Sequence, residues 1–200
     1  MKQLIKIFVI YLFILVPFFS LADEKKQTIN NIYKLLQEKK FEEGIKNLEI
    51  LSEKNDIKAQ LLYSKILYSG DLIPQNFEKS YFWGFSALLG GLKKSSNVLE
   101  KLSDYITEKQ VVEITNKLKE FLENRAFLKD KRAIIQIAKL YEEFTEPPDL
   151  VNAYTWYNIA VAQGIKTAKT KRDEVLDNLS EKELLDAQTL SIKLFKRINN

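Results

Sequence analysis

The chain of 200 residues contains no cysteine and no histidine, and it has only six glycines and four prolines. Without cysteine there is no disulfide, no thiol nucleophile and no zinc ribbon. Without histidine there is no imidazole base, no histidine-containing metal site and no Ser-His-Asp triad. We therefore predict no catalytic residues, no metal and no cofactor.

The first residues resemble an export signal. Two lysines precede an apolar run from Ile7 to Phe19, and Ser20-Leu21-Ala22 then supplies small residues at the −3 and −1 positions of a cleavage site. A membrane span needs about 20 apolar residues, and this run is shorter. We interpret residues 1–22 as a cleaved signal peptide, with no stable membrane insertion afterwards. The alternative is an uncleaved anchor, which a mass measurement of the mature N-terminus would reveal.

Export places the mature chain in the periplasm or cell envelope, away from cytoplasmic nucleic acid. Cleavage removes two lysines, so the net charge falls from +4 to about +2. The basic clusters, such as Lys129 to Arg132, are short and flanked by acids. We therefore expect no nucleic-acid partner.

The chain carries an internal repeat with an offset of 73 residues. Seven identities appear when residues 67–91 are laid on residues 140–164, where about one or two are expected by chance. The matched pairs are Leu67/Leu140, Tyr68/Tyr141, Pro74/Pro147, Tyr81/Tyr154, Trp83/Trp156, Ala87/Ala160 and Gly91/Gly164. Periods of this length are typical of stacked modules that bind partners.

The mature chain reads as helices joined by short turns, because apolar residues fall three and four apart. We divide it into the signal peptide 1–22, an N-terminal hairpin in 23–56, a first repeat unit 57–128 and a second unit 129–200 with C-terminal capping helices. Each unit is predicted to hold four helices, starting near Ile57, Asn76, Leu92 and Thr107, and then near Lys131, Asp149, Ile165 and Ser180.

Helix-end signals support these starts. Capping boxes are predicted at Thr107-x-x-Gln110 and Ser180-x-x-Glu183, again 73 residues apart. The remaining end signals are N-caps at Asn76 and Asp149, and glycines suited to a left-handed helix end at Gly91 and Gly164.

The second helix of each unit has a tryptophan between small residues. Their spacing of i, i+3 and i+7 lets a neighbouring helix approach closely while the indole fills the gap. The residues are Ser80, Trp83 and Ala87, and then Ala153, Trp156 and Ala160. We predict that both tryptophans are buried in an interior shared by consecutive modules.

The pattern resembles the Sel-one-like repeat family, a branch of tetratricopeptide-like solenoids. The second unit follows its order closely with Ala133, Ile137-Ala138, Tyr141, Pro147, Ala153, Trp156-Tyr157, Ala160 and Gly164. The first unit follows with Tyr68, Gly70, Pro74, Ser80, Trp83, Ala87 and Gly91. It departs in two ways: Ala59 lies nine residues before Tyr68, where Ala133 lies eight before Tyr141, and Gly84 replaces the second aromatic residue.

The resemblance covers about residues 57–195, and it implies a fold and a role. The fold is all-α, a right-handed superhelix (solenoid) of helical hairpins with a concave binding groove. The role is that of an adaptor or scaffold for protein–protein interaction, without enzymatic activity.

Two sets of residues suggest other chemistry. The aromatic stripe Tyr81, Phe82, Trp83 and Phe85 could stack on sugar rings, although its helical spacing favours a place in the core. The carboxylates Glu142, Glu143, Glu146 and Asp149 could serve a hydrolase acting on cell-wall glycan, or hold calcium, but their pattern favours solvated charge. Such a hydrolase is the alternative function.

The most informative binding hypothesis comes from the repeat geometry. In tetratricopeptide-like arrays the first helix of each pair lines the inner wall, so its residues outside the core stripe would meet a partner. These are polar and net basic, which suits an acidic peptide segment or a terminal carboxylate. The predicted partner-binding residues are Lys58, Ser64, Lys65, Arg132, Gln136 and Lys139.

Overall fold

A computed structural model describes residues 28–200. The predicted signal peptide and residues 23–27 lie outside the described residues. The described part is all helical and has no β-strand, as predicted. Within it no helix is both long enough and apolar enough to cross a bilayer.

Ten α-helices and one short 3-10 helix make up the described chain. The N-terminal hairpin is α1 (Ile29–Gln37) and α2 (Phe41–Glu53). The first unit contains α3 (Ile57–Ser69), α4 (Phe77–Leu89), η1 (Lys93–Ser95), α5 (Ser96–Leu102) and α6 (Glu108–Phe127). The second contains α7 (Lys131–Glu143), α8 (Leu150–Ala162), α9 (Ala168–Leu176) and α10 (Glu181–Asn199).

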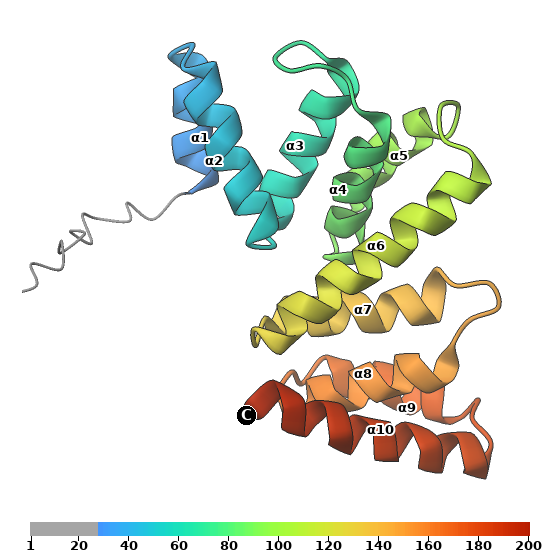
Figure 1. The fold of residues 1–200 in the computed structure, drawn as a ribbon. Coiled ribbons are helices and arrows are strands. Elements are labelled where there is room, and N and C mark those ends of the chain that lie inside the picture. The colour runs from blue at the N-terminus through green and yellow to red at the C-terminus, as the bar shows by residue number, and fades with distance from the viewer. Residues whose placement is uncertain (1–27) are drawn as a thin grey trace, which may run out of the picture.

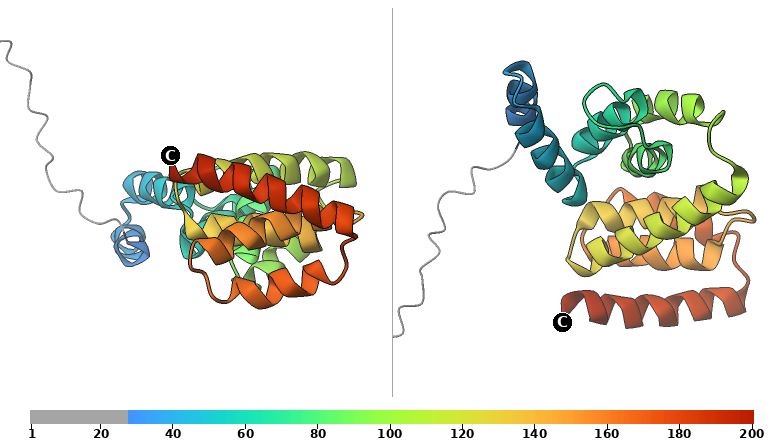
Figure 2. Two further views of the ribbon diagram at one scale, coloured as in Figure 1. Left: turned by 90° about the horizontal axis from the view of Figure 1, so that it is seen from below. Right: turned by 45° about the horizontal axis from the view of Figure 1, so that its top comes forward.

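The helices follow one another from the α1–α2 hairpin at one end of the array to α10 at the other (Figure 1). Most pack on the preceding helix, whereas α6 packs on α4 and α10 on α8. The views in Figure 2 show α10 beside α8 at the α10 end of the array, and α8 also packs on α7 and α9. The second unit is therefore built around α8.

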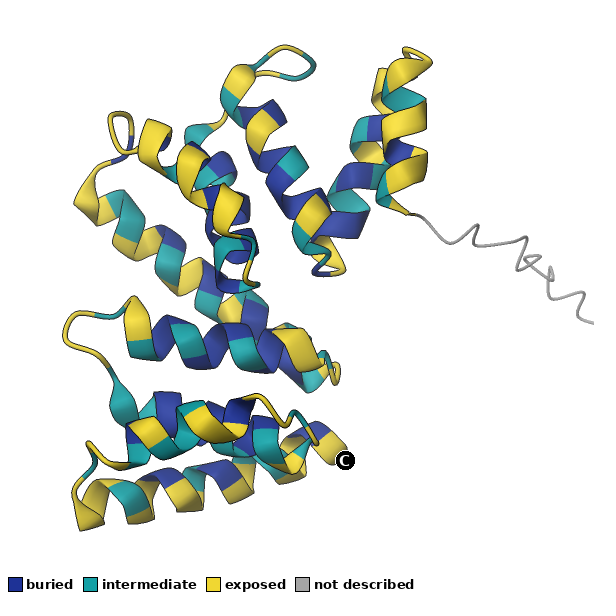
Figure 3. Ribbon diagram, turned by 180° about the vertical axis from the view of Figure 1, so that it is seen from behind, coloured by how far each residue is buried: buried dark blue, intermediate teal, exposed yellow. Residues whose placement is uncertain are grey.

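The buried residues form stripes along the helix sides that face a neighbour (Figure 3). Trp83 and Trp156 are 5% and 2% exposed, so the prediction that both are buried is confirmed. Phe82 packs against all three apolar clusters of the described chain, which connects them into one interior. The cluster around Trp156 also includes Phe85 and Leu118 from the first unit, so consecutive units share core.

The predicted helix starts are confirmed for six of the eight helices of the two units. The side chains of Asn76 and Asp149 accept a hydrogen bond from the backbone three residues on, and both capping boxes form. The third α-helix of each unit begins later than predicted, at Ser96 and Ala168, because the 3-10 helix η1 precedes α5 and a turn precedes α9.

Five helices end in the same tight turn, with its middle residue in the left-handed region. The predicted turns contain Gly91 and Gly164, and three more contain Lys39, Asn55 and Lys129, with φ of 59°, 62° and 64°. In each, the next N–H donates to a carbonyl five residues back, as the N–H of Asp56 does to the carbonyl of Leu51. The turns at Lys39 and Lys129 were not predicted, because lysine is unusual at positive φ, whereas asparagine is common there and Asn55 was a signal that the sequence offered.

The first helices of the two units correspond with an offset of 74 residues, not 73. Asp56 and Asp130 both cap their helix, and the buried residues of α3 and α7 match at this offset. Leu67 is therefore the counterpart of Tyr141, and the identity of Tyr68 with Tyr141 is a coincidence of register. The loop before α4, one residue longer than the loop before α8, restores the offset of 73.

Gly84 replaces the second aromatic residue because α5 lies close to α4 at this point. A Cβ atom on Gly84 would lie 2.9 Å from Ser64 Oγ and 3.1 and 3.2 Å from carbons of Leu99 and Val98. In the second unit, Tyr157 is buried at the corresponding position, and its hydroxyl donates to Glu142 at 2.6 Å.

Candidate functional site

Four of the predicted partner-binding residues occupy two equivalent positions of the repeat. At the offset of 74, Lys58 corresponds to Arg132 and Lys65 to Lys139. Lys58, Lys65 and Arg132 are exposed, and Lys139 is half-buried. Among residues 28–200, no carboxylate lies within ion-pair distance of any of these four side chains. Both copies of the repeat thus present unneutralised cations at the same two places.

The other two predicted binding residues, Ser64 and Gln136, are fully buried, so the expectation that they lie outside the packed interior is wrong. Ser64 Oγ donates to the carbonyl oxygen of Ser80 at 2.7 Å, which fixes α3 against α4. Gln136 Nε2 donates to the carbonyl oxygen of Ser86 at 2.8 Å and so ties α7 to α4. The prediction failed because it assumed that each helix has one buried side. These helices are packed on more than one side, so polar residues opposite the apolar stripe are buried as well.

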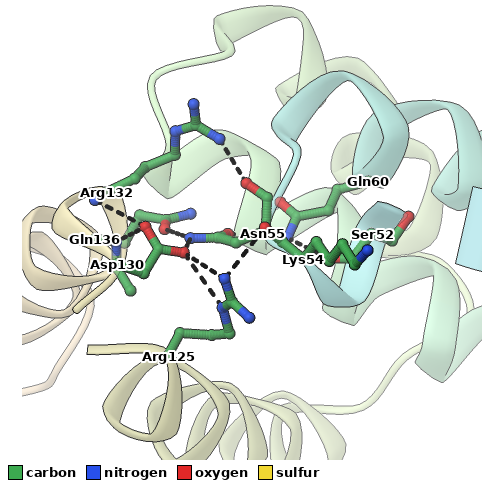
Figure 4. Close-up of polar contacts among 9 residues, drawn as sticks. Ser52, Lys54, Asn55, Gln60, Arg125, Asp130, Arg132 and Gln136 are labelled. Atoms are coloured by element: carbon green, nitrogen blue, oxygen red, sulfur yellow. Dashed lines mark hydrogen bonds and ion pairs between the residues drawn. The ribbon is translucent and has the colours of Figure 1, made fainter. Parts of the chain in front are cut away.

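Gln136 belongs to a buried polar cluster centred on Asn55, in the turn between α2 and α3 (Figure 4). Asn55 Nδ2 donates to Gln136 Oε1 at 2.7 Å and to Asp130 Oδ2 at 3.1 Å. Its Oδ1 accepts from Gln60 Nε2 at 3.0 Å. This cluster, which we call the Asn55 cluster, joins segments that are 75 to 81 residues apart in the sequence.

Two arginines surround the Asn55 cluster. Arg125 at the end of α6 donates through Nε and Nη2 to Asp130 Oδ2, both at 3.2 Å, and Arg132 Nη1 donates to the carbonyl oxygen of Asn55 at 2.5 Å. Asp130 Oδ1 meanwhile caps α7. Arg132 therefore supports the turn as well as presenting charge, whereas Lys58, Lys65 and Lys139 have no such structural bond among the described residues.

The predicted aromatic stripe is core. Trp83 and Phe85 are buried, and Tyr81 and Phe82 are half-buried and pack against the apolar clusters. The indole of Trp83 meets Phe82 and Phe121 edge-on, with ring centroids 4.8 and 5.6 Å apart. These rings leave no flat face for a sugar.

The candidate acids do not converge. Glu142 Oε2 accepts from the Tyr157 hydroxyl at 2.6 Å, and Glu142 Oε1 lies 3.3 Å from Lys171 Nζ. Asp149 caps α8, while Glu143 and Glu146 are exposed. Burial, together with the bond to Glu142, raises the pKa of the Tyr157 hydroxyl well above its ordinary value of 10.0, so it is a neutral donor at pH 7. These contacts hold α7, α8 and α9 together.

A second hydrogen-bonded group of three side chains holds the N-terminal hairpin against α3 and α4. Glu49 on α2 accepts from Lys79 Nζ on α4 at 2.6 Å and from the Tyr63 hydroxyl on α3 at 3.1 Å. The hydrogen bond from Lys79 lowers the pKa of Glu49. Within residues 28–200, no group of three or more acidic residues is placed to hold a metal ion.

The α4–α6 contact of the first unit is looser than its counterpart in the second. A hollow of about 220 Å³ lies between α4 and α6. Its lining residues are Asn76, Glu78, Lys79, Phe82, Ile114 and Lys117. Between α8 and α10, Thr155 donates to the carbonyl oxygen of Ala187 at 3.2 Å, because these small residues allow close approach.

An exposed row of aromatic rings was not predicted as a site. We call Tyr68, Phe77 and Tyr105 the aromatic ladder. The ring centroids of Tyr68 and Phe77 are 6.0 Å apart, and those of Phe77 and Tyr105 are 4.5 Å apart. A sequence signal was available for Phe77 and Tyr105, which have no aromatic counterpart in the second unit. It was absent for Tyr68, which matches Tyr141 in the sequence and has a non-aromatic counterpart only in the register of the structure.

No known family model matches this chain, and no curated protein matches it.

Proposed function

We propose that the protein is an exported helical-repeat adaptor of the Sel-one-like type, a right-handed solenoid that binds an acidic segment of a partner protein in the periplasm or cell envelope. The observation that carries the proposal is the repetition of unneutralised cations, with Lys58 and Lys65 on α3 and Arg132 and Lys139 on α7. All four side chains lie outside the apolar core, and the three lysines have no bond that holds the fold within the described residues. Their charge suits a partner carboxylate.

Charge reversal tests the proposal. Lys65→Glu combined with Lys139→Glu is expected to abolish co-purification of partner proteins from the native envelope, because both positions would then repel carboxylates. The helical circular dichroism should be unchanged, since neither side chain has an ion-pair partner among the described residues. Mass spectrometry of the captured proteins would identify the partner.

The matched control is Lys182→Glu combined with Lys193→Glu on α10. Both lysines are exposed and have no ion-pair partner in the described part of the chain, so the change in net charge is the same. Partner capture should survive in this control. Capture by the Lys65→Glu/Lys139→Glu chain that stays at the level of the control would exclude Lys65 and Lys139 as partner contacts.

A further inference from the structure

The two repeat units offer an internal comparison. Where both units have the same residue at equivalent positions, the packing common to both units explains it. An exposed residue found in one unit alone is not required for that packing, because the other unit closes the same junction without it. Exposed apolar surface of this kind marks interaction sites in soluble proteins.

Tyr105 meets this criterion in full. Tyr68 and Phe77 pack with one side against the apolar cluster around Leu102 and leave the other side accessible. The members of the aromatic ladder come from three elements: Tyr68 from the end of α3, Phe77 from the start of α4, and Tyr105 from the turn before α6. Tyr105 is 55% exposed, and the other two are half-buried. The corresponding residues of the second unit are Glu142, Leu150 and Asn178.

The ladder also carries an unneutralised charge. Lys101 on α5 is exposed, and its Nζ lies 6.0 Å from the centroid of the Tyr68 ring. No carboxylate of residues 28–200 lies within ion-pair distance of it, and its counterpart in the second unit is the acidic residue Glu174. A ligand acid beside the rings would complement this amine.

The geometry of the rings points to one class of ligand. Neighbouring rings are inclined by 42° and 32°, so they form steps and not one flat platform of the kind on which a sugar stacks. The hydroxyls of Tyr68 and Tyr105 form no hydrogen bond with any described residue and are free to donate. A polyproline II chain has exposed carbonyl oxygens without internal partners, and proline rings that fit between aromatic side chains.

We propose that the aromatic ladder, with Lys101, binds an extended, proline-containing acidic segment of a partner protein. The proposal rests on the proposed adaptor function and adds a second contact surface, separate from the four basic positions on α3 and α7. Proline rings lie against Phe77 and the two tyrosine rings, the phenol hydroxyls donate to peptide carbonyls, and a carboxylate pairs with Lys101.

The test uses the full chain and a short fluorescein-labelled peptide of alternating proline and glutamate, followed by fluorescence polarisation. Tyr105→Ser is expected to weaken binding at least about tenfold, because tyrosine is a frequent anchor of such interfaces. Tyr33→Ser, at a tyrosine 48% exposed on α1, is the matched control and should leave binding unchanged. Lys101→Glu should weaken binding of this peptide but not of a proline-only peptide.

Three outcomes overturn the inference: no binding of the proline–glutamate peptide, equal binding by the Tyr105→Ser chain, or equal binding of an alanine–glutamate peptide. A chitin oligosaccharide that competes for the ladder as well as the peptide does would also overturn it. If envelope partners still co-purify with the Tyr105→Ser chain and fail to do so with the Lys65→Glu/Lys139→Glu chain, the adaptor function stands without the ladder.

Discussion

At the scale of single residues, Gly84 shows a packing constraint that outweighs helix propensity. Alanine normally stabilises a helix interior by about 1 kcal/mol relative to glycine. Here its Cβ would be 2.9 Å from Ser64 Oγ, a hydroxyl already held by the carbonyl of Ser80. We expect Gly84→Ala to lower the free energy of unfolding by about 1–3 kcal/mol, as overpacking does, measured by urea denaturation.

Gly44 in α2 provides the matched control. A Cβ there would lie 2.9 Å from Leu36 Cδ2, the end of a flexible side chain that can move aside. Gly44→Ala should therefore be neutral or stabilising. A Gly84→Ala chain as stable as the Gly44→Ala chain would show that Ser64 on α3 and the side chains of α5 can move away from α4.

At the scale of elements, the Tyr63–Glu49–Lys79 group fixes α2 on α3 and α4, and it predicts an acid dependence. The hydrogen bond from Lys79 lowers the pKa of Glu49 below its ordinary value of 4.5. A carboxyl group with a lowered pKa in the folded state stabilises the fold above the unfolded pKa. This contribution is lost as the pH falls through the folded value. Glu49→Gln should thus lower the melting temperature at pH 7 and reduce its further fall below about pH 4.5.

Glu53 on the same helix is exposed and has no ion-pair partner among the described residues, so Glu53→Gln is the comparison. Its melting temperature should follow the parent chain across the same pH range. Parallel curves for the parent and Glu49→Gln chains would contradict the assignment.

Helices were the most predictable elements, because apolar spacing and caps such as Asn76 and Ser180 depend on local sequence alone. The candidate site was less predictable. Ser64 and Gln136 are polar and were expected on a solvent-exposed helix face, yet both are buried. Ser64 is covered by the next helix, α4, and Gln136 meets residues 50 and 81 positions away in the sequence. The register of α3 was also not predictable from the sequence. Tyr68 and Tyr141 are the same residue type at an offset of 73, although α3 and α7 superpose at an offset of 74.

At the scale of the whole molecule, we expect the Asn55 cluster to make the array unfold as one unit. Repeat arrays that contact only their neighbours tend to lose cooperativity with length. Asn55 instead joins the turn after α2 to Asp130 and Gln136 at the start of the second unit. Replacing Asn55 would leave buried polar groups without partners, at a cost of about 1–3 kcal/mol.

The two tryptophans allow this coupling to be measured. Trp83 packs with the N-terminal hairpin and Trp156 lies in the second unit, so Trp156→Phe and Trp83→Phe chains each report one half by fluorescence. In the parent background the two melting midpoints should coincide. With Asn55→Ala added, the midpoint reported by Trp83 should fall below that reported by Trp156, because the side-chain bonds from residue 55 to Asp130 and Gln136 are lost. Of its hydrogen bonds to the second unit, only the bond from Arg132 to the backbone carbonyl is kept. Midpoints that stay together in both backgrounds would mean that the shared apolar core, and not the Asn55 cluster, couples the halves.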